Sequence, residues 1–261
     1  MTGVNIRVNA NTRPAQAELG RLNRSLGSLE AQASKIQKTF RNVGLAISGA
    51  FAATQLTRGL NSAADSITNL NNRLALVVGK GDAAAKTLDA LFVVAADTRS
   101  SIDQSAETFQ RFGLALKDAG KNSDDFLKIT KLVNQAAILS STGPESAKAA
   151  IIQLGQGLAS GQLRGQELNS VLEQTPRLAK AIADGMGIPF GSLRKAAEDG
   201  LLTTQTVFDA IIDQSQTLGD EFKLMNATVG DLTTVLGNEF TRALAKVDGV
   251  LGFSDSAKET I

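Results

Sequence analysis

The stretch TGPESAKAAIIQLGQGLASGQLRGQELNSVLEQTPRLAKAIADGMG, residues 142–187, decides the fold class of this chain. Pro144 and Pro176 each follow a threonine-containing helix-start signal, and proline favours the first turn of a helix. Gly185 is typical of the point where the second helix ends. The stretch therefore predicts short amphipathic helices with glycine-rich turns between them. Apolar residues share one face of the first helix: Ala147, Ile151, Leu154 and Leu158.

The same punctuation continues on both sides of this stretch. Ser101 and Gln104 form a capping box ahead of a stripe that contains Phe109 and Phe112. We interpret that stripe as core and not as a ligand box. Thr203 is expected to cap a further helix. These signals predict a compact all-α domain over residues 81–215.

A longer pattern precedes this domain. Beyond Pro14, apolar residues recur in alternating steps of three and four, which is the a/d seam of helices that supercoil around each other. The seam predicts a long coiled-coil-like helix over residues 13–80, with a kink near Gly44 to Gly49. It either joins copies of the chain or packs against the chain's own domain. Its residues are Leu19, Leu22, Leu26, Leu29, Ala33, Ile36, Phe40, Val43 and Ile47.

The two ends of the chain have patterns of their own. Val4, Ile6 and Val8 alternate with polar residues, which predicts a short strand in an N-terminal arm, residues 1–12. A second rod-like pattern predicts a C-terminal helical rod over residues 216–261. Its apolar positions are Leu218, Phe222, Met225, Val229, Leu232 and Leu236.

Composition excludes several kinds of chemistry. The 261 residues contain no His and no Cys, which removes histidine general bases, cysteine nucleophiles, disulfides and the usual zinc ligands. The net charge of +1 gives no global field toward nucleic acid or a membrane. We expect no cofactor, no metal site and no specific nucleic-acid site. One basic helix face is either solvated or faces DNA or an acidic wall: Arg21, Arg24, Lys35, Lys38 and Arg41.

Two patterns suggest chemistry but lack the geometry for it. Glu167 and Glu173 lie six residues apart, which places their side chains about 120° apart around one helix. They are therefore exposed helix charges and not a pair of catalytic carboxylates. Gly155, Gly157 and Gly161 follow no strand and match no phosphate-loop spacing. We expect no enzymatic activity.

The block from Gln153 to Gly187 resembles the signature of the tape measure domain of long-tailed bacteriophages. The likeness continues through Gly191–Thr204 and Val207–Ile212, and a weaker likeness extends back to about Leu70. The positions that carry it are Gly155, Gly161, Gly165, Glu167, Leu168, Pro176, Leu178, Gly185, Gly187 and Gly200.

The resemblance implies a structural role. Copies of the chain, as a trimer or hexamer, would lie in the lumen of the growing tail while tube subunits polymerise around them. Tail length then follows template length, and the template is ejected before the DNA. The implied partners are tail tube, tail-tip and tail-end proteins, tail assembly chaperones, and a host membrane on ejection. The implied locations are the virion tail and, during assembly, the host cytoplasm.

Two alternatives stay open at this point. The first is a membrane-active, envelope-penetrating helical protein that inserts Asn42–Thr57. The second is a tail-associated peptidoglycan hydrolase that uses Glu167 and Glu173. Family members are usually several times longer, whereas a fully helical chain of this length spans at most about 390 Å. We therefore expect either a fragment, which the unpunctuated end at Ile261 favours, or an unusually short tail.

Overall fold

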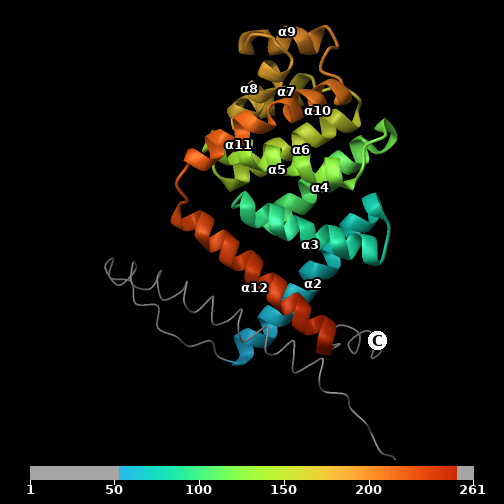
Figure 1. The fold of residues 1–261 in the computed structure, drawn as a ribbon, viewed down its shortest axis with the longest axis vertical. Helices are drawn as coiled ribbons and strands as arrows, with labels where there is room; N and C mark the ends of the chain where they lie inside the picture. Colours follow the sequence, from blue (N-terminus) through green and yellow to red (C-terminus); the bar gives the residue numbers. More distant parts are fainter. Residues whose placement is uncertain (1–52, 252–261) are drawn as a thin grey trace, which may run out of the picture. The chain divides into compact units, whose positions relative to one another are not determined.

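The computed structural model describes residues 53–251, and every regular element in that range is a helix (Figure 1). The predicted all-α class is confirmed for this part of the chain. The predicted strand and the seam from Leu19 to Ile47 lie outside the described residues. The α-helices are α2 (Ala53–Val78), α3 (Asp82–Asp97), α4 (Ile102–Ala115), α5 (Ser123–Ser140), α6 (Pro144–Ala159), α7 (Gly165–Gln174), α8 (Pro176–Gly185), α9 (Leu193–Glu198), α10 (Thr204–Asp213), α11 (Ser215–Leu224) and α12 (Val229–Leu251).

The chain divides into two units. One is Ala63–Arg242, and the other combines residues 1–62 with 243–261, of which only 53–62 and 243–251 are described. The described parts of the second unit are the beginning of α2 and the end of α12. The first unit contains the whole resembling block, and its helices position the sites considered below.

Helix starts follow local side-chain chemistry. Pro144 and Pro176 occupy the first turns of α6 and α8 as predicted. Ser101 Oγ accepts a hydrogen bond from the Gln104 backbone N–H at 3.1 Å. Thr203 Oγ1 does the same for Thr206 at 3.1 Å. A reciprocal capping box also begins α5, where Asn122 and Asp125 exchange side-chain and backbone hydrogen bonds.

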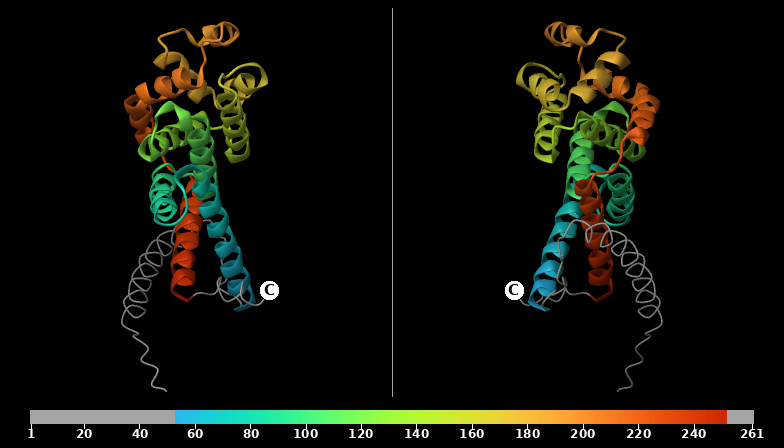
Figure 2. Two further views of the ribbon diagram at one scale, coloured as in Figure 1. Left: turned by 90° about the vertical axis from the view of Figure 1, so that its right-hand side faces the viewer. Right: turned by 90° about the vertical axis from the view of Figure 1, so that its left-hand side faces the viewer.

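The core of the first unit is centred on α4 and α5. Phe109 and Phe112 are fully buried, which confirms the predicted core stripe. The Phe109 ring meets the Phe126 ring edge-on, with 5.9 Å between centroids. The side views show α6 and α11 on opposite sides of α5 (Figure 2). Helices on both sides leave the central pair with little exposed apolar surface.

Helix α2 contributes to this core. Leu70 and Leu74 are buried in the same cluster as Phe109. Val77 approaches α4 so closely that a Cβ on Gly113 would overlap its side chain. The apolar repeat of α2, from residue 67 to 77, therefore packs inside the chain's own unit. This packing extends the unit upstream of residue 81.

The rod predicted for residues 216–261 is interrupted. Helix α11 ends at Leu224 and α12 begins at Val229. Leu218 and Phe222 are buried in the core cluster or against it, so α11 belongs to the compact unit. Met225 has an extended backbone, and its carbonyl accepts a 2.9 Å hydrogen bond from the Arg99 guanidinium. Thr228 and Asp231 then exchange side-chain and backbone hydrogen bonds at 2.8 and 3.1 Å, which caps the start of α12. The helix is therefore interrupted where periodicity alone predicts continuation.

Helix α12 has a polar buried face. Asn238 is 4% exposed, and its side-chain amide accepts from Ile102 N at 2.9 Å and donates to Ser100 O at 2.8 Å. Val229 and Phe240 lie roughly opposite Asn238 around the helix and are 59% and 45% exposed. Within the described residues 229–243, α12 therefore turns its polar side to the unit and its apolar side to solvent.

Candidate functional site

The residues that carry the resemblance fall into separate places in the unit. The first place is the turn between α6 and α7. The backbone there pairs with the segment that follows α9, because Leu163 N–H donates to Leu202 O at 2.8 Å and Thr204 N–H donates to Gly161 O at 3.2 Å. The Thr204 hydroxyl also donates to Leu158 O at 2.6 Å. These contacts bring Gly161, Gly165 and Gly200 to one turn region.

All three glycines of this region have backbones that a side chain disfavours. Gly161 has φ 92°, Gly165 has φ 57° and Gly200 has φ 72°, which are positive values that favour glycine. A Cβ on Gly200 would also touch the Gln162 side chain at 3.6 Å. The glycine requirement at these positions is thus conformational, and it keeps the paired turn in place.

A hollow of about 410 Å³ lies beside this turn. Gly165 and Leu168 line it together with Arg164, Arg194 and Glu198. Leu168 is buried, so it forms the floor, while the charged groups are on the rim. The rim carries both signs of charge and no hydroxyl–base pair.

The second place is the packing of α8 against α10. Leu178 is fully buried, and a Cβ on Gly185 would overlap the backbone of Ala210. Gly187, two residues later, has φ 67° and ends the helix in a left-handed turn. This part of the signature therefore sets how closely two helices approach.

Gly155 marks a third place, where α6 crosses α4. A Cβ at Gly155 would lie 2.6 Å from Cδ of Arg111. Arg111 is held in position by a 2.8 Å ion pair with Glu107 on the same helix. The signature residues thus act on helix approach and turn geometry at three separate contacts.

The candidate carboxylates lie as expected from their spacing. Glu167 and Glu173 are both on α7, where Glu167 is half-buried in the first turn and Glu173 is exposed near the end. Neither residue lines the hollow beside the α6–α7 turn. The arrangement gives no support to the hydrolase alternative.

Two further features are absent from the described residues. No group of three or more Asp or Glu side chains in residues 53–251 is arranged to hold a metal ion. Within the same range, no helix has the length and apolar character to cross a bilayer. The proposed inserting segment Asn42–Thr57 lies mostly outside that range.

Several polar residues that the sequence analysis did not single out are buried or link helices of the unit. Asn238 links α12 to the α3–α4 turn, and Arg99 links that turn to α11. Gln135 is buried on α5 although glutamine is usually exposed. Sequence alone could have marked such residues as polar groups on the apolar face of a helix, as Asn134 and Gln135 are beside Val133. It could not have predicted their contacts, because the partners of these polar groups lie far away in the sequence.

An all-helical unit whose signature residues shape turns and helix contacts defines a structural or binding domain. A protein family described as tape measure protein matches residues 58–249. Since that range covers more than half of the chain, the chain belongs to the tape measure protein family, which is a family of structural proteins of bacteriophage tails. Neither a curated protein nor a solved structure matches it.

Proposed function

We propose that this chain is a tail tape measure: it templates polymerisation of the tail tube and sets tail length from inside the lumen. The family match over residues 58–249 is the observation that carries the proposal. The signature residues support it, because their packing roles suit a protein that acts by occupying space. Ejection ahead of the DNA is the last step of the same proposal.

The length-setting element is the part of the predicted 13–80 helix that precedes the compact unit, residues 13–62, together with any further helices of the full template. A helix adds about 1.5 Å of length per residue, so a template of this kind converts residue number into distance. The seam from Leu19 to Ile47 would join three or six copies in parallel register. The compact unit Ala63–Arg242 would serve as a docking body for tail tube, tail-tip or tail-end proteins and for assembly chaperones.

The decisive experiment changes the template length in the phage that carries this chain. A second copy of residues 19–46, four heptads, keeps the seam in phase and adds about 42 Å of helix. Tails measured by electron microscopy should lengthen by about that amount. A scrambled version of residues 19–46, unchanged in length, is the matched control and should leave tail length unaltered if tails form. Normal tails of unchanged length after the duplication would contradict the proposal.

Self-association has its own test. Light scattering on the full chain after size exclusion should show a single oligomer. Leu22→Asp and Leu29→Asp place charges at the seam and should give monomers, because a buried unpaired carboxylate costs several kcal/mol. Arg24→Asp, on the outer face, is the control and should keep the oligomer. If the wild-type chain is a monomer at micromolar concentration, self-association through the seam is contradicted, and the seam packs within the chain instead.

A further inference from the structure

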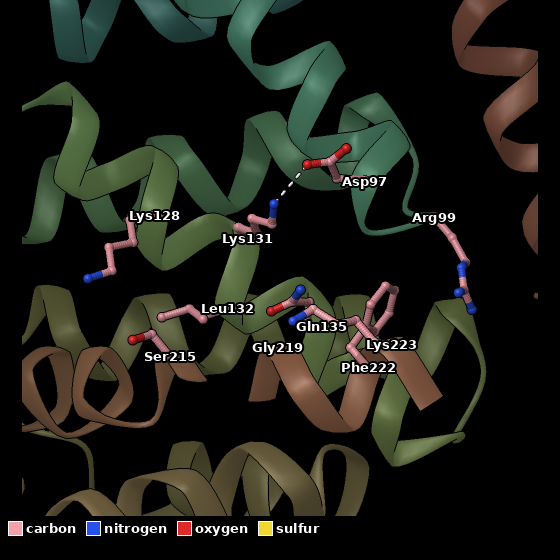
Figure 3. A pocket seen from close by; sticks show the side chains of 10 residues that line it. All are labelled: Asp97, Arg99, Lys128, Lys131, Leu132, Gln135, Ser215, Gly219, Phe222 and Lys223. Carbon is pink, nitrogen blue, oxygen red and sulfur yellow. Dashed lines mark hydrogen bonds and ion pairs between the residues drawn. The ribbon is translucent and has the colours of Figure 1, made fainter. Parts of the chain in front are cut away.

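A cleft of about 490 Å³ lies between the end of α3 and the helices α5 and α11 (Figure 3). It is on the opposite side of α5 from the α6–α7 turn, and it contains none of the signature residues. Arg99 comes from the turn after α3, Lys131 and Gln135 come from α5, and Phe222 and Lys223 come from α11. All of these residues belong to the unit Ala63–Arg242.

The charge of the cleft differs from that of the chain. Four cationic side chains line it, Arg99, Lys128, Lys131 and Lys223, against the single carboxylate of Asp97. Lys131 is paired with Asp97 at 2.7 Å, and Lys223 is paired with Asp220 at 2.8 Å. The whole chain has a net charge of only +1, so this local excess of cations marks the cleft as a place for an anion.

One cation of the cleft does not use all its hydrogen-bonding groups within the chain. Nη2 of Arg99 donates to Met225 O at 2.9 Å, whereas Nη1 is buried without a partner among the described residues. A buried polar group without a partner is unfavourable, so an acceptor oxygen in the cleft would be favourable beside this guanidinium. The side chain of Gln135, a residue that is 5% exposed, also lines the cleft and adds an amide that can donate to an acceptor.

The floor of the cleft is apolar. Leu132 and Phe222 are both buried residues that line it, and a Cβ on Gly219 would meet open space. The Phe222 ring already lies 4.7 Å from the Arg99 guanidinium carbon, so it is not free to stack on a nucleobase. A concave site with cations above an apolar floor fits an aliphatic or aromatic side chain beside a carboxylate better than it fits a phosphate backbone.

We propose that this cleft binds an acidic peptide segment of a partner protein. A carboxylate of the peptide lies between Arg99, Lys131 and the Gln135 amide, and a neighbouring apolar side chain rests on Leu132 and Phe222. The inference goes beyond length measurement and does not depend on it. A domain with such a cleft has a defined recognition site for acidic sequence, whatever the length of the template.

The test measures fluorescence anisotropy of the full chain with a panel of labelled eight-residue peptides. Each peptide has one Asp or Glu beside Leu, Ile or Phe, and each has a twin in which Asn or Gln replaces the acid. We expect at least one acidic peptide to bind, and its amide twin to bind at least tenfold more weakly, because charge-assisted hydrogen bonds are the stronger ones. Gln135→Met and Lys131→Met should each weaken the acidic peptide by about tenfold.

Matched controls separate binding from folding. Lys195→Met removes an exposed lysine on α9, away from the cleft, and should bind the peptide like the wild type. Circular dichroism of each variant checks the fold. If Gln135→Met unfolds the chain, peptide binding by the rim variant Lys131→Met still tests the proposal. The proposal is overturned if no acidic peptide binds, if acid and amide twins bind equally, or if Lys131→Met has no effect. It is also overturned if inorganic phosphate or a short DNA duplex binds the cleft more tightly than any peptide.

Discussion

Helices α4 and α12 are both amphipathic, but they use their faces in opposite ways. Helix α4 buries Phe109 and Phe112 completely in the core. Helix α12 buries Asn238 instead and leaves Val229, Leu232 and Phe240 exposed. An apolar stripe at helical spacing therefore shows which residues lie on the same face of a helix. It does not show whether that face is buried, because burial depends on which other elements pack against the helix. The exposed stripe of α12 is of the kind that marks interaction sites.

The largest expected difference comes from deleting the same side chain on the two helices. Phe112→Ala in α4 should lower the free energy of unfolding by about 3–5 kcal/mol, because it leaves a cavity in a packed core. Phe240→Ala in α12 should change it by about 0.5 kcal/mol or less. Urea denaturation of the full chain measures both values. Equal losses would mean that the α12 stripe is packed in solution, and the contrast would fail.

The polar contact of α12 should be the next most sensitive. Asn238→Leu removes both side-chain bonds and leaves Ile102 N–H and Ser100 C=O without partners, at a cost of about 2–3 kcal/mol. Amide hydrogen exchange should show α12 losing protection while α4 keeps it. Asn226→Leu, in the exposed loop before α12, is the control. Unchanged protection of α12 in the Asn238 variant would show that other contacts hold the helix.

Replacing a helical glycine by alanine should change the free energy of unfolding in opposite directions in a packed helix and in an exposed one. Gly185→Ala in α8 forces a Cβ onto the backbone of Ala210 and should destabilise by about 1–3 kcal/mol. Gly237→Ala in α12 meets open space and should stabilise by up to about 1 kcal/mol, since alanine is the better helix former. Thermal melts of both variants give the comparison. A destabilising Gly237→Ala would place another chain or segment against α12.

The smallest effect concerns charge on α11, the neighbour of α12 in sequence. A hydrogen bond from Lys223, and then its charge, lower the pKa of Asp220 below 3.8. Because the pKa is lower in the folded chain, the pair stabilises the fold above pH 3.8, and this stabilisation is lost as pH falls through the lowered pKa. Asp220→Asn should therefore lose stability slightly at neutral pH and match the wild type in strong acid.

Urea midpoints recorded from neutral to acidic pH test this difference, with Lys223→Gln as the companion variant that should give the same profile. The opposite sign is expected on α9. Asp199 raises the pKa of Lys195 above 10.5, first through a hydrogen bond and then through its charge. That pair stabilises the fold below pH 10.5 and ceases to do so as pH rises through the raised pKa. Urea midpoints of Lys195→Met recorded from neutral to alkaline pH test this second pair. A difference from the wild type that does not change with pH, in either range, would show that solvent screens that surface pair.

Local chemistry made much of the fold predictable from sequence. Pro144, Pro176, Ser101 and Thr203 each begin a helix because the side chain or ring acts on its own neighbouring backbone. The core stripe of α4 was predictable for the same reason, since a strong apolar period needs no knowledge of its partner. The close approach of Gly185 to Ala210 gives a physical basis to one glycine of the family signature.

Long-range contacts account for what the sequence did not predict. The break after Leu224 has one long-range contact, from Arg99 to Met225 O, which no local pattern predicts. It also has a local signal that the rod pattern overrode, because Thr228 and Asp231 form a capping box at the start of α12. The cleft brings together residues from three helices, so Gln135 and Lys223 show no relation in sequence. The rod pattern across residues 216–261 continues through the break because both α11 and α12 are amphipathic, although their apolar faces meet different surroundings.

The two hydrogen bonds of the Asn238 side chain also fix the position of α12 along its own axis. A single amide that both accepts from Ile102 and donates to Ser100 can be satisfied at only one axial position of α12. Sliding the helix by one turn, about 5.4 Å, would break both bonds and bring no equivalent amide into place. Asn238 therefore fixes the axial register of α12, within residues 229–242, against the turn between α3 and α4.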